Sequence, residues 1–194
     1  LTDATNGRVL LGGDPVTGPT TDMGVVFQAY HLFPWLTVEQ NVGFGLERTD
    51  RSAAERERRV DEMLELVGLT EFRGTYPKSL SGGMKQRVAI ARALAVDPDL
   101  LLMDEPFGAV DAQTREMLQR ELLDVWASTG KTVLFVTHDV AEAVTLADRI
   151  VVMAADPGRV REVVDVDVER PRERGDAAFA EYVGRVRELI GAGP

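Results

Sequence analysis

Cysteine is absent from this sequence, so disulfide bonds and thiolate metal sites are excluded. Long apolar runs are absent too: the longest is six residues, 150–155, far short of the roughly 18 that a membrane-spanning helix needs. The N-terminus shows neither a basic segment followed by an apolar stretch nor any other secretory signal. Together these absences favour a cytoplasmic protein.

Basic residues are outnumbered, with 22 Lys and Arg against 32 Asp and Glu and a formal net charge of -10. Surfaces that bind nucleic acids neutralise phosphates with Lys and Arg, so this balance predicts no nucleic-acid partner. Apolar residues make up 44% of the 194 positions, which is enough for an ordered core and excludes intrinsic disorder.

The hydrophobic pattern predicts an α/β fold. From residue 100 onward, strand-like runs alternate with helical patterns, which indicates a parallel sheet with helices on its faces. Residues 38–80 are helical in pattern and contain no good strand, so they are interpreted as a helical subdomain inserted in the core. The tail predicts a strand pair and then a helix, with Arg170-Pro171-Arg172 as a surface turn. The predicted strands are 8–11, 23–27, 100–103, 132–136 and 149–153, and the helices are 53–67 with Gly68 as its cap, one capped by Asp111, and 176–190.

The clearest chemical signal is Leu100-Leu101-Leu102-Met103-Asp104-Glu105-Pro106, in which an apolar strand runs into two carboxylates. Ligands of open α/β sheets bind at the carboxyl ends of the strands. There Asp104 could hold Mg²⁺ while Glu105 faces an attacking water. The alternative is a strand that simply ends in a polar turn.

A second signal is Ser81-Gly82-Gly83, which opens a predicted helix. Backbone N–H groups without Cβ crowding, the positive end of the helix dipole and a hydroxyl can together bind a phosphate. The same tripeptide is also common as an ordinary junction between a loop and a helix.

Two further polar residues follow predicted strands. His138 comes after the strand at 132–136 and could reach the same crevice as Glu105, and Gln28 comes directly after the strand at 23–27 and could ligate Mg²⁺ or orient water. Each alone is equally compatible with a structural histidine or a plain loop residue.

The order of these elements, with the loop Gly108-Ala109-Val110-Asp111, resembles the ATP-binding cassette of ABC transporters over nearly the whole chain. Phe27-Gln28 followed by Leu32-Phe33-Pro34-Trp35, and Thr137-His138-Asp139 followed by Glu142-Ala143, are most similar to the nitrate, sulfonate and taurine importer branch. The resemblance implies a P-loop NTPase-like (RecA-like) sheet core with the helical subdomain inserted in it.

The resemblance also implies roles for the site residues, with ATP and Mg²⁺ as ligands. Asp104 and Gln28 would serve Mg²⁺, Glu105 would be the general base or polarise water, and His138 would contact the γ-phosphate. In the family two cassettes pair head to tail. The residues that would act across that dimer, on the ATP of the second cassette, are Ser81, Gly82, Gly83 and Asp111.

The family resemblance further implies partners and a division of the chain. Residues 38–80 would receive a coupling helix from a membrane permease, so the chain would lie on the inner face of the membrane, indirectly served by a solute-binding protein for a small anion. Phe33 and Trp35 are either permease contacts or buried under the helical subdomain. The expected units are 1–37 with the glutamine loop, 38–94 ending in the signature helix, 95–158 as the α/β core, and 159–194 as the tail.

One element of the family is missing. A cassette needs Gly-x-x-x-x-Gly-Lys-Ser/Thr, whose amides cradle the β-phosphate while the lysine neutralises it. Gly130-Lys131-Thr132 has Val125 where the first glycine belongs and leads into a strand, so it is interpreted as a helix-to-strand turn. We therefore expect the phosphate loop and the first strands to lie upstream of Leu1, and the chain alone to bind ATP poorly. The alternative to an importer ATPase is an incompetent cassette that only pairs with an intact partner, or a gene fragment.

Overall fold

The computed structural model describes residues 4–108, 110–155 and 157–191. Its strands are β1 (Leu10–Leu11), β2 (Asp14–Pro15), β3 (Met23–Phe27), β4 (Leu100–Asp104), β5 (Thr132–Val136), β6 (Arg149–Ala155) and β7 (Gly158–Asp165). Its α-helices are α1 (Val38–Gly43), α2 (Ala53–Leu66), α3 (Gly82–Ala95), α4 (Ala112–Thr129), α5 (Val140–Leu146) and α6 (Ala177–Gly191). Short 3-10 helices are η1 (Phe44–Arg48), η2 (Thr70–Phe72) and η3 (Pro77–Ser79).

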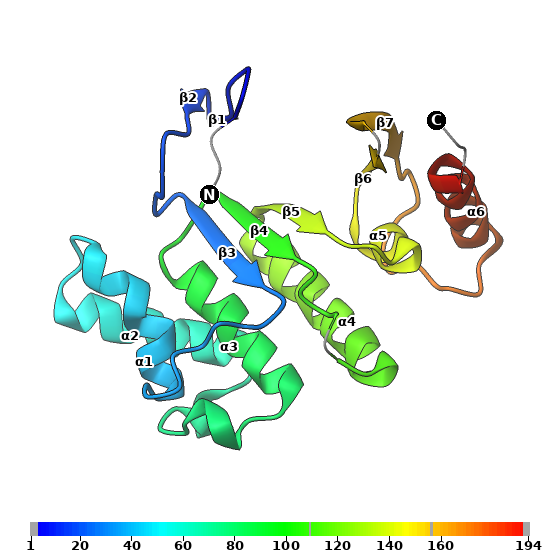
Figure 1. Ribbon diagram of the computed structural model, residues 1–194. Coiled ribbons are helices and arrows are strands. Elements are labelled where there is room, and N and C mark those ends of the chain that lie inside the picture. Colours follow the sequence, from blue (N-terminus) through cyan, green and yellow to red (C-terminus); the bar gives the residue numbers. More distant parts are fainter. Residues whose placement is uncertain (1–3, 109, 156, 192–194) are drawn as a thin grey trace.

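A parallel sheet with the strand order β3-β4-β5 lies at the centre of the molecule (Figure 1). Phe27, Asp104 and Val136 are in register at its carboxyl end. The sequence predicted all three strands to within one residue, because each is a short aliphatic run of the kind that parallel sheets bury. The predicted α/β class with a parallel sheet is confirmed.

Helices cover only one face of this sheet. Val26, Leu101 and Met103 are buried beneath α3 and α4 and belong to the main hydrophobic core. The alternate positions point to the other side and remain in solvent, which is unusual because parallel sheets are normally covered on both faces. We call this surface the open sheet face; it consists of Val25, Phe27, Leu134 and Val136, which are 37%, 41%, 52% and 50% exposed.

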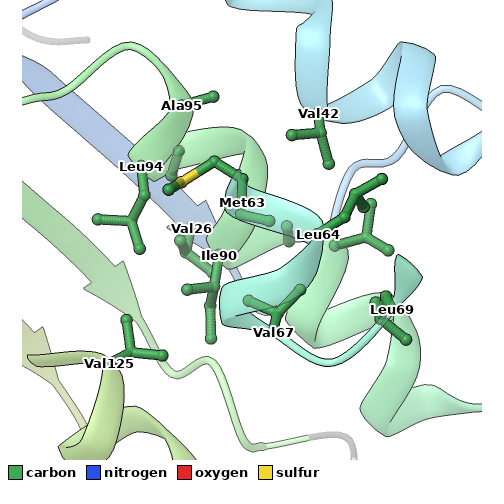
Figure 2. Packing of buried hydrophobic residues seen from close by; sticks show 14 of the residues in the cluster. Val26, Val42, Met63, Leu64, Val67, Leu69, Ile90, Leu94, Ala95 and Val125 are labelled. Carbon is green, nitrogen blue, oxygen red and sulfur yellow. The ribbon is translucent and has the colours of Figure 1, made fainter. Parts of the chain in front are cut away.

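The helical region packs on α3 and has no strand between residues 38 and 80, all of which the structure describes. Capping boxes at Thr37 and Ser52 begin α1 and α2. Figure 2 shows Met63 and Leu64 of α2 packed toward Ile90 of α3. The helix predicted over 53–67 ends one residue earlier, and Gly68 follows it with a left-handed φ of 65° as expected of a C-terminal cap.

A second, smaller core lies around β6 and β7, which the sequence had placed differently. The run at 149–153 was expected to extend the parallel sheet, but β6 pairs antiparallel with β7 in a separate two-stranded sheet. Only two residues separate the ends of these strands, and such a short connection permits antiparallel pairing alone. The predicted strand pair in the tail is therefore wrong: the described tail residues supply only β7 and α6, with Phe179 and Val186 of α6 buried in this core.

The first predicted strand is also corrected. Residues 8–11 were expected to form a strand, but β1 spans Leu10–Leu11 alone and pairs with β2 in a local hairpin rather than with the main sheet. The turn is made by Gly12 and Gly13, which have φ values of 61° and 99° that most other residues avoid.

The prediction of a surface turn at Arg170-Pro171-Arg172 is wrong for the third residue. Arg172 is buried, and its guanidinium donates to the carbonyl oxygens of Val144, Ala147, Val166 and Val168 at 2.6–3.1 Å. Arg170 stacks over the Trp126 ring at 4.7 Å and pairs with Asp148. These arginines fasten the tail to α4 and α5.

Within the described part of the chain, no helix is both long and apolar enough to cross a lipid bilayer.

Candidate functional site

The polar residues predicted at the ends of three strands lie at one edge of the parallel sheet. Gln28 follows β3 directly, Asp104 ends β4, and His138 stands two residues beyond β5. Because Phe27, Asp104 and Val136 are in register, these strand ends are neighbours. The edge therefore presents an amide, two carboxylates and an imidazole on one side of the molecule.

Glu105 has an unusual backbone. Its φ is 43°, in the left-handed region that costs a non-glycine residue about 1–2 kcal/mol. Two hydrogen bonds hold it there: its N–H donates to Val136 O at 2.9 Å, and its carbonyl accepts from Gly108 N at 3.0 Å. Strain of this kind persists only where the surroundings impose it, and it concentrates at functional sites.

The side chain of Glu105 is directed to His138. Its Oε1 lies 3.1 Å from His138 Nδ1, and the two side chains are 33% and 76% exposed. A carboxylate and an imidazole in contact, both reached by water, can bind and polarise a solvent molecule or an incoming oxyanion.

Gln28 packs against the turn that follows Glu105. A Cβ placed on Gly108 would lie 2.8 Å from Gln28 Nε2, so a larger residue at this position would displace the amide. The structure therefore brings Gln28 to the same turn as the carboxylates. Ala109, the next residue of the predicted loop, lies outside the described residues.

The oxygen donors at this edge suit Mg²⁺ bound together with a phosphate. Asp104 is exposed at the end of β4, and carboxylate and amide oxygens are the protein ligands that Mg²⁺ prefers. No group of three or more His, Asp or Glu that could hold a metal occurs among the described residues. The donor set fits a magnesium ion that takes further ligands from substrate phosphates, and not a closed protein cage.

The glycine-rich junction lies in a second group of residues. Ser81 caps α3 by accepting from Met84 N at 3.2 Å, and both Ser81 and Gly82 are exposed. The first turn of a helix leaves N–H groups without partners inside the helix, so this terminus can accept an anion. Among the described residues, no hydrogen bond or ion pair joins Ser81 or the two glycines to Asp104, Glu105 or His138.

The start of α3 lies against the start of α4. A Cβ on Gly83 would be 3.3 Å from Thr114 Cγ2, and a Cβ on Gly82 would be 3.7 Å from Val110 Cγ1. Asp111 caps α4 as predicted, accepting from Thr114 N at 3.0 Å and from the Thr114 hydroxyl at 2.6 Å. These hydrogen bonds, that of the hydroxyl first, hold the pKa of the exposed Asp111 carboxyl below its ordinary value.

Two arginines that the sequence analysis missed support these loops. Arg115 donates to Val110 O at 3.2 Å, and its Nη1 lies 3.7 Å from Asp139 Oδ2, next to His138. Arg92 of α3 binds the backbone of Tyr30 and His31, immediately after Gln28. The carbonyl oxygens that Arg92 binds are about 60 positions away in the sequence, and the Asp139 that Arg115 approaches is 24 positions away, so no local pattern could reveal these contacts.

The aromatic residues near the glutamine loop are partly in solvent. Trp35 is 70% exposed, so the interpretation that it is buried under the helical region is wrong. Phe33 is half-buried between Trp35 and Phe44, with ring centroids at 5.6 and 4.3 Å. The helices thus leave a partly exposed aromatic surface, formed by Phe33, Trp35 and Phe44, whose contact with water is unfavourable.

Gly130-Lys131-Thr132 takes no part in the site. Gly130 ends α4 with a φ of 62°, and Lys131 pairs with Asp97 at 2.8 Å. The helix-to-strand turn predicted for this triplet is confirmed.

Comparison with known proteins gives one consistent family. A family profile described as ABC transporter matches residues 1–108. An uncharacterized ABC transporter ATP-binding protein of Methanocaldococcus jannaschii is 54% identical over 186 residues, which are 96% of this chain and 70% of that protein. A putative ATP-binding protein of Brucella abortus is 56% identical over 89% of this chain and 66% of its own length. The aliphatic sulfonates import ATP-binding protein SsuB of Bacillus cereus is 44% identical over 96% of this chain and 73% of its own length. The chain thus spans about two thirds to three quarters of these relatives.

Proposed function

Since this chain belongs to the ABC transporter ATP-binding family, we propose that it is the nucleotide-binding subunit of an importer and contributes to coupling ATP hydrolysis to solute uptake. The observation that carries this proposal is the contact between Glu105 and His138 at the strand edge that also bears Gln28 and Asp104. Phosphoryl transfer to water depends on positioning and charge stabilisation, which this constellation can supply.

In the proposed reaction water attacks the γ-phosphorus in line with the leaving ADP oxygen. Glu105 accepts or polarises the proton of that water, and His138 donates a hydrogen bond to the γ-phosphate from its solvent-facing side. The Gln28 amide orients the same water from the turn at Gly108. The strained backbone of Glu105 supports this assignment, since it fixes the carboxylate beside the imidazole.

Mg²⁺ fits the oxygen donors of Asp104 and Gln28, and when bound it would neutralise charge on the nucleotide phosphates. Asp104 would hold it directly or through water, since its carboxylate is exposed at the sheet edge.

The glycine-rich junction is proposed to act on a nucleotide held by a second cassette in a head-to-tail dimer. Ser81 and Gly82 are exposed, and among the described residues no hydrogen bond or ion pair joins them to Asp104 or Glu105, which supports a role across an interface. Asp111, exposed beside it at the start of α4, would face the same interface.

The lack of a phosphate-binding loop in these 194 residues limits the binding of ATP by this polypeptide alone. These 194 residues contain no Gly-x-x-x-x-Gly-Lys-Ser/Thr element. Hydrogen bonds to charged groups contribute about 1.5–3 kcal/mol each, so three missing ones weaken binding by more than about a thousandfold. We propose that the chain in this form binds Mg-ATP weakly and does not turn it over by itself.

The proposed partners are a membrane permease, contacted through the exposed aromatic surface at Phe33 and Trp35, and indirectly a solute-binding protein. On this proposal the chain would lie on the cytoplasmic side of the membrane, attached through the permease. The name of the SsuB relative supports a small anion such as a sulfonate as the solute, with nitrate and taurine as related candidates.

The second candidate function is a cassette that cannot hydrolyse ATP at its own site and only lends Ser81 to Gly83 to an intact partner. The observation behind this candidate is that these 194 residues contain no Gly-x-x-x-x-Gly-Lys-Ser/Thr element. Both candidates predict weak Mg-ATP binding by this chain alone, and titration calorimetry that finds micromolar affinity would contradict that prediction.

A complementation experiment tests the role across the dimer. The chain is mixed with an intact family member whose own signature glycine is changed to aspartate, and formation of the mixed dimer is checked by gel filtration. ATP turnover should appear in the mixed dimer and disappear with Gly82→Asp, at a position where an added Cβ would lie 3.5 Å from the Tyr30 hydroxyl and 3.7 Å from Val110 Cγ1. Gly184→Asp on α6, where a Cβ meets open space, is the matched control. A mixed dimer that forms but hydrolyses nothing contradicts the proposal.

A further inference from the structure

The loop that follows Gln28 is held by a side chain from a distant helix. Arg92, in the last turn of α3, donates from Nη1 to His31 O at 2.7 Å and from Nη2 to Tyr30 O at 3.0 Å. Both acceptors are backbone carbonyl oxygens, and the planar fork of a guanidinium can reach two such groups at once. Burial lowers the pKa of Arg92 from its ordinary value, and the carbonyl oxygens replace part of its lost hydration.

The two residues that Arg92 binds have a strained backbone. Tyr30 and His31 have φ values of 60° and 46°, in the left-handed region that side chains rarely adopt, and neither is glycine. Local hydrogen bonds from Tyr30 N to Phe27 O and from His31 N to Ala29 O tighten the turn. Two consecutive left-handed residues are unfavourable unless other contacts impose them, and Arg92 supplies such contacts.

The chain on the far side of the loop is fixed separately. Phe33 donates its N–H to Asn41 Oδ1 at 2.8 Å and accepts from Asn41 Nδ2 at 3.1 Å, and Asn41 is fully buried in α1. The Arg92 guanidinium also lies over the Phe33 ring, 5.6 Å from its centroid. The loop therefore runs from the sheet edge at Gln28 to the helical region, and Arg92 contacts it at Tyr30, His31 and Phe33.

Tyr30 contacts α3 near both of its ends. Its carbonyl binds Arg92 in the last turn, while its hydroxyl would lie 3.5 Å from a Cβ on Gly82 at the first turn. Tyr30 is therefore linked to both ends of α3. Only Ala29 separates Tyr30 from Gln28, whose amide packs on Gly108.

We propose that Arg92 is a positioning residue for Gln28: by binding the carbonyl oxygens of Tyr30 and His31 it ties the Gln28 amide to the position of helix α3. The purpose of this tie rests on the proposed function. There, the tie makes the position of the water-orienting Gln28 amide depend on the helix that carries Ser81 to Gly83. The link itself involves only this chain.

Hydrogen exchange tests whether Arg92 holds the loop. In Arg92→Gln the amides of Tyr30 and His31 should exchange at least about tenfold faster, since one lost hydrogen bond to a charged group already corresponds to that factor. Arg92→Lys keeps the charge but cannot reach both carbonyl oxygens. The exchange rates of the Tyr30 and His31 amides in this variant should therefore fall between those of the unmodified chain and those of Arg92→Gln. Arg59→Gln is the control for support of α3 itself, because Arg59 likewise binds two carbonyl oxygens, but those of Leu94 and Ala95 at the end of α3 and not those of the loop.

A spectroscopic readout separates positioning from mere support of the fold. The ¹⁵N side-chain amide resonance of Gln28 should shift in Arg92→Gln and stay in place in Arg59→Gln. Gly108→Ala is the positive control, since its Cβ would meet Gln28 Nε2 directly. An unchanged Gln28 resonance in Arg92→Gln overturns the proposal, as does loop exchange within twofold of the unmodified chain; if Arg92→Gln does not fold, Arg92→Lys decides by the same two readouts. Neither readout needs nucleotide, so a negative result leaves the proposed ATP site standing.

Discussion

The Nδ1 atom of His138 lies 3.1 Å from Oε1 of Glu105, across the carboxyl ends of two adjacent parallel strands. The pair is joined by backbone as well as side chain, because Glu105 N donates to Val136 O at the end of the histidine's own strand. The relative position of the carboxylate and the imidazole is thus fixed by the register of the sheet and by the left-handed backbone of Glu105, and not by burial of the two side chains.

The first prediction concerns which carboxylate works in a mixed dimer. With an intact partner whose signature is inactivated, ATP is held by the partner's phosphate loop and closed by Ser81 to Gly83 of this chain. Glu105→Gln should therefore leave steady-state ATP turnover within about twofold, whereas loss of a general base that acts on the reacting water lowers rates by about 10²–10⁴. A large loss of turnover with Glu105→Gln would show that this chain's own edge is the working site.

A second prediction addresses backbone strain at Glu105. Glu105→Gly should be more stable than Glu105→Ala by about 1 kcal/mol, because glycine adopts a φ of 43° without steric conflict. Both variants lose the same solvent-exposed contact with His138, so the comparison isolates the backbone. Urea unfolding of the two variants measures the difference, and equal midpoints would argue against strain.

The approach of β3 to α3 gives a third prediction. A Cβ on Gly24 would lie 2.8 Å from the backbone oxygen of Ala93 and 3.0 Å from Leu101 Cδ1, so Gly24→Ala should lower the free energy of unfolding by about 1–3 kcal/mol. Gly184→Ala in α6 meets nothing within 4 Å and should be neutral or stabilising by up to about 1 kcal/mol. Thermal or urea unfolding of both variants provides the check; if Gly24→Ala were as stable as Gly184→Ala, the packing described for β3 would be wrong.

The buried arginine of the tail gives a fourth prediction. Arg172→Ala leaves four carbonyl oxygens without their donor and should lower the unfolding free energy by about 3 kcal/mol or more. Arg174→Ala loses only an exposed pair with Glu116 and should change it by less than about 1 kcal/mol. Limited proteolysis should then cut the Arg172 variant before α6 first. Equal sensitivity of the two variants to the protease would contradict the role of Arg172 in fastening the tail.

The fifth prediction is a pH dependence. The hydrogen bond from Lys131, followed by nearby positive charge, holds the pKa of Asp97 below its ordinary value of 3.8. A carboxyl with a lower pKa in the folded state stabilises the fold above its unfolded pKa, and this contribution is lost as the pH falls through the folded pKa. The half-exposed position limits the effect to under about 1 kcal/mol.

Asp97→Asn is the suitable variant, because asparagine tolerates the φ of 62° at this position. It should be less stable than the unmodified chain at pH 7, and the difference should shrink as the pH falls below 3.8, as measured by urea unfolding over a pH series. A stability difference that does not shrink with acid would contradict the assignment to Asp97.

The sequence predicts best what short segments decide for themselves. The strands β3, β4 and β5, the caps at Asp111 and Gly68, and the turn at Gly130 follow from local patterns of apolar residues, caps and glycines. It fails where groups far apart in the sequence decide, since Arg172 is buried among carbonyl oxygens up to 28 positions away. The antiparallel pairing of β6 with β7 was missed for another reason: the short gap that imposes it is defined only once the ends of both strands are known.

The same division holds for the candidate site. The motifs place Gln28, Asp104 and His138 at strand ends, and the parallel register then makes them neighbours. The left-handed Glu105, the room that Gly108 leaves for Gln28, and the hold of Arg92 on the loop are three-dimensional facts without a local signature. The catalytic and cross-dimer roles of these residues remain predictions.

The open sheet face has a practical consequence for handling the polypeptide. The apolar side chains of Phe27, Leu134 and Val136 are exposed to solvent, whereas helices or strands usually cover such a surface. Preparations of these 194 residues by themselves should stain with environment-sensitive fluorescent dyes and form soluble clusters as concentration rises. Self-association through the open sheet face, more than unfolding, should then limit the concentration at which the chain stays monomeric.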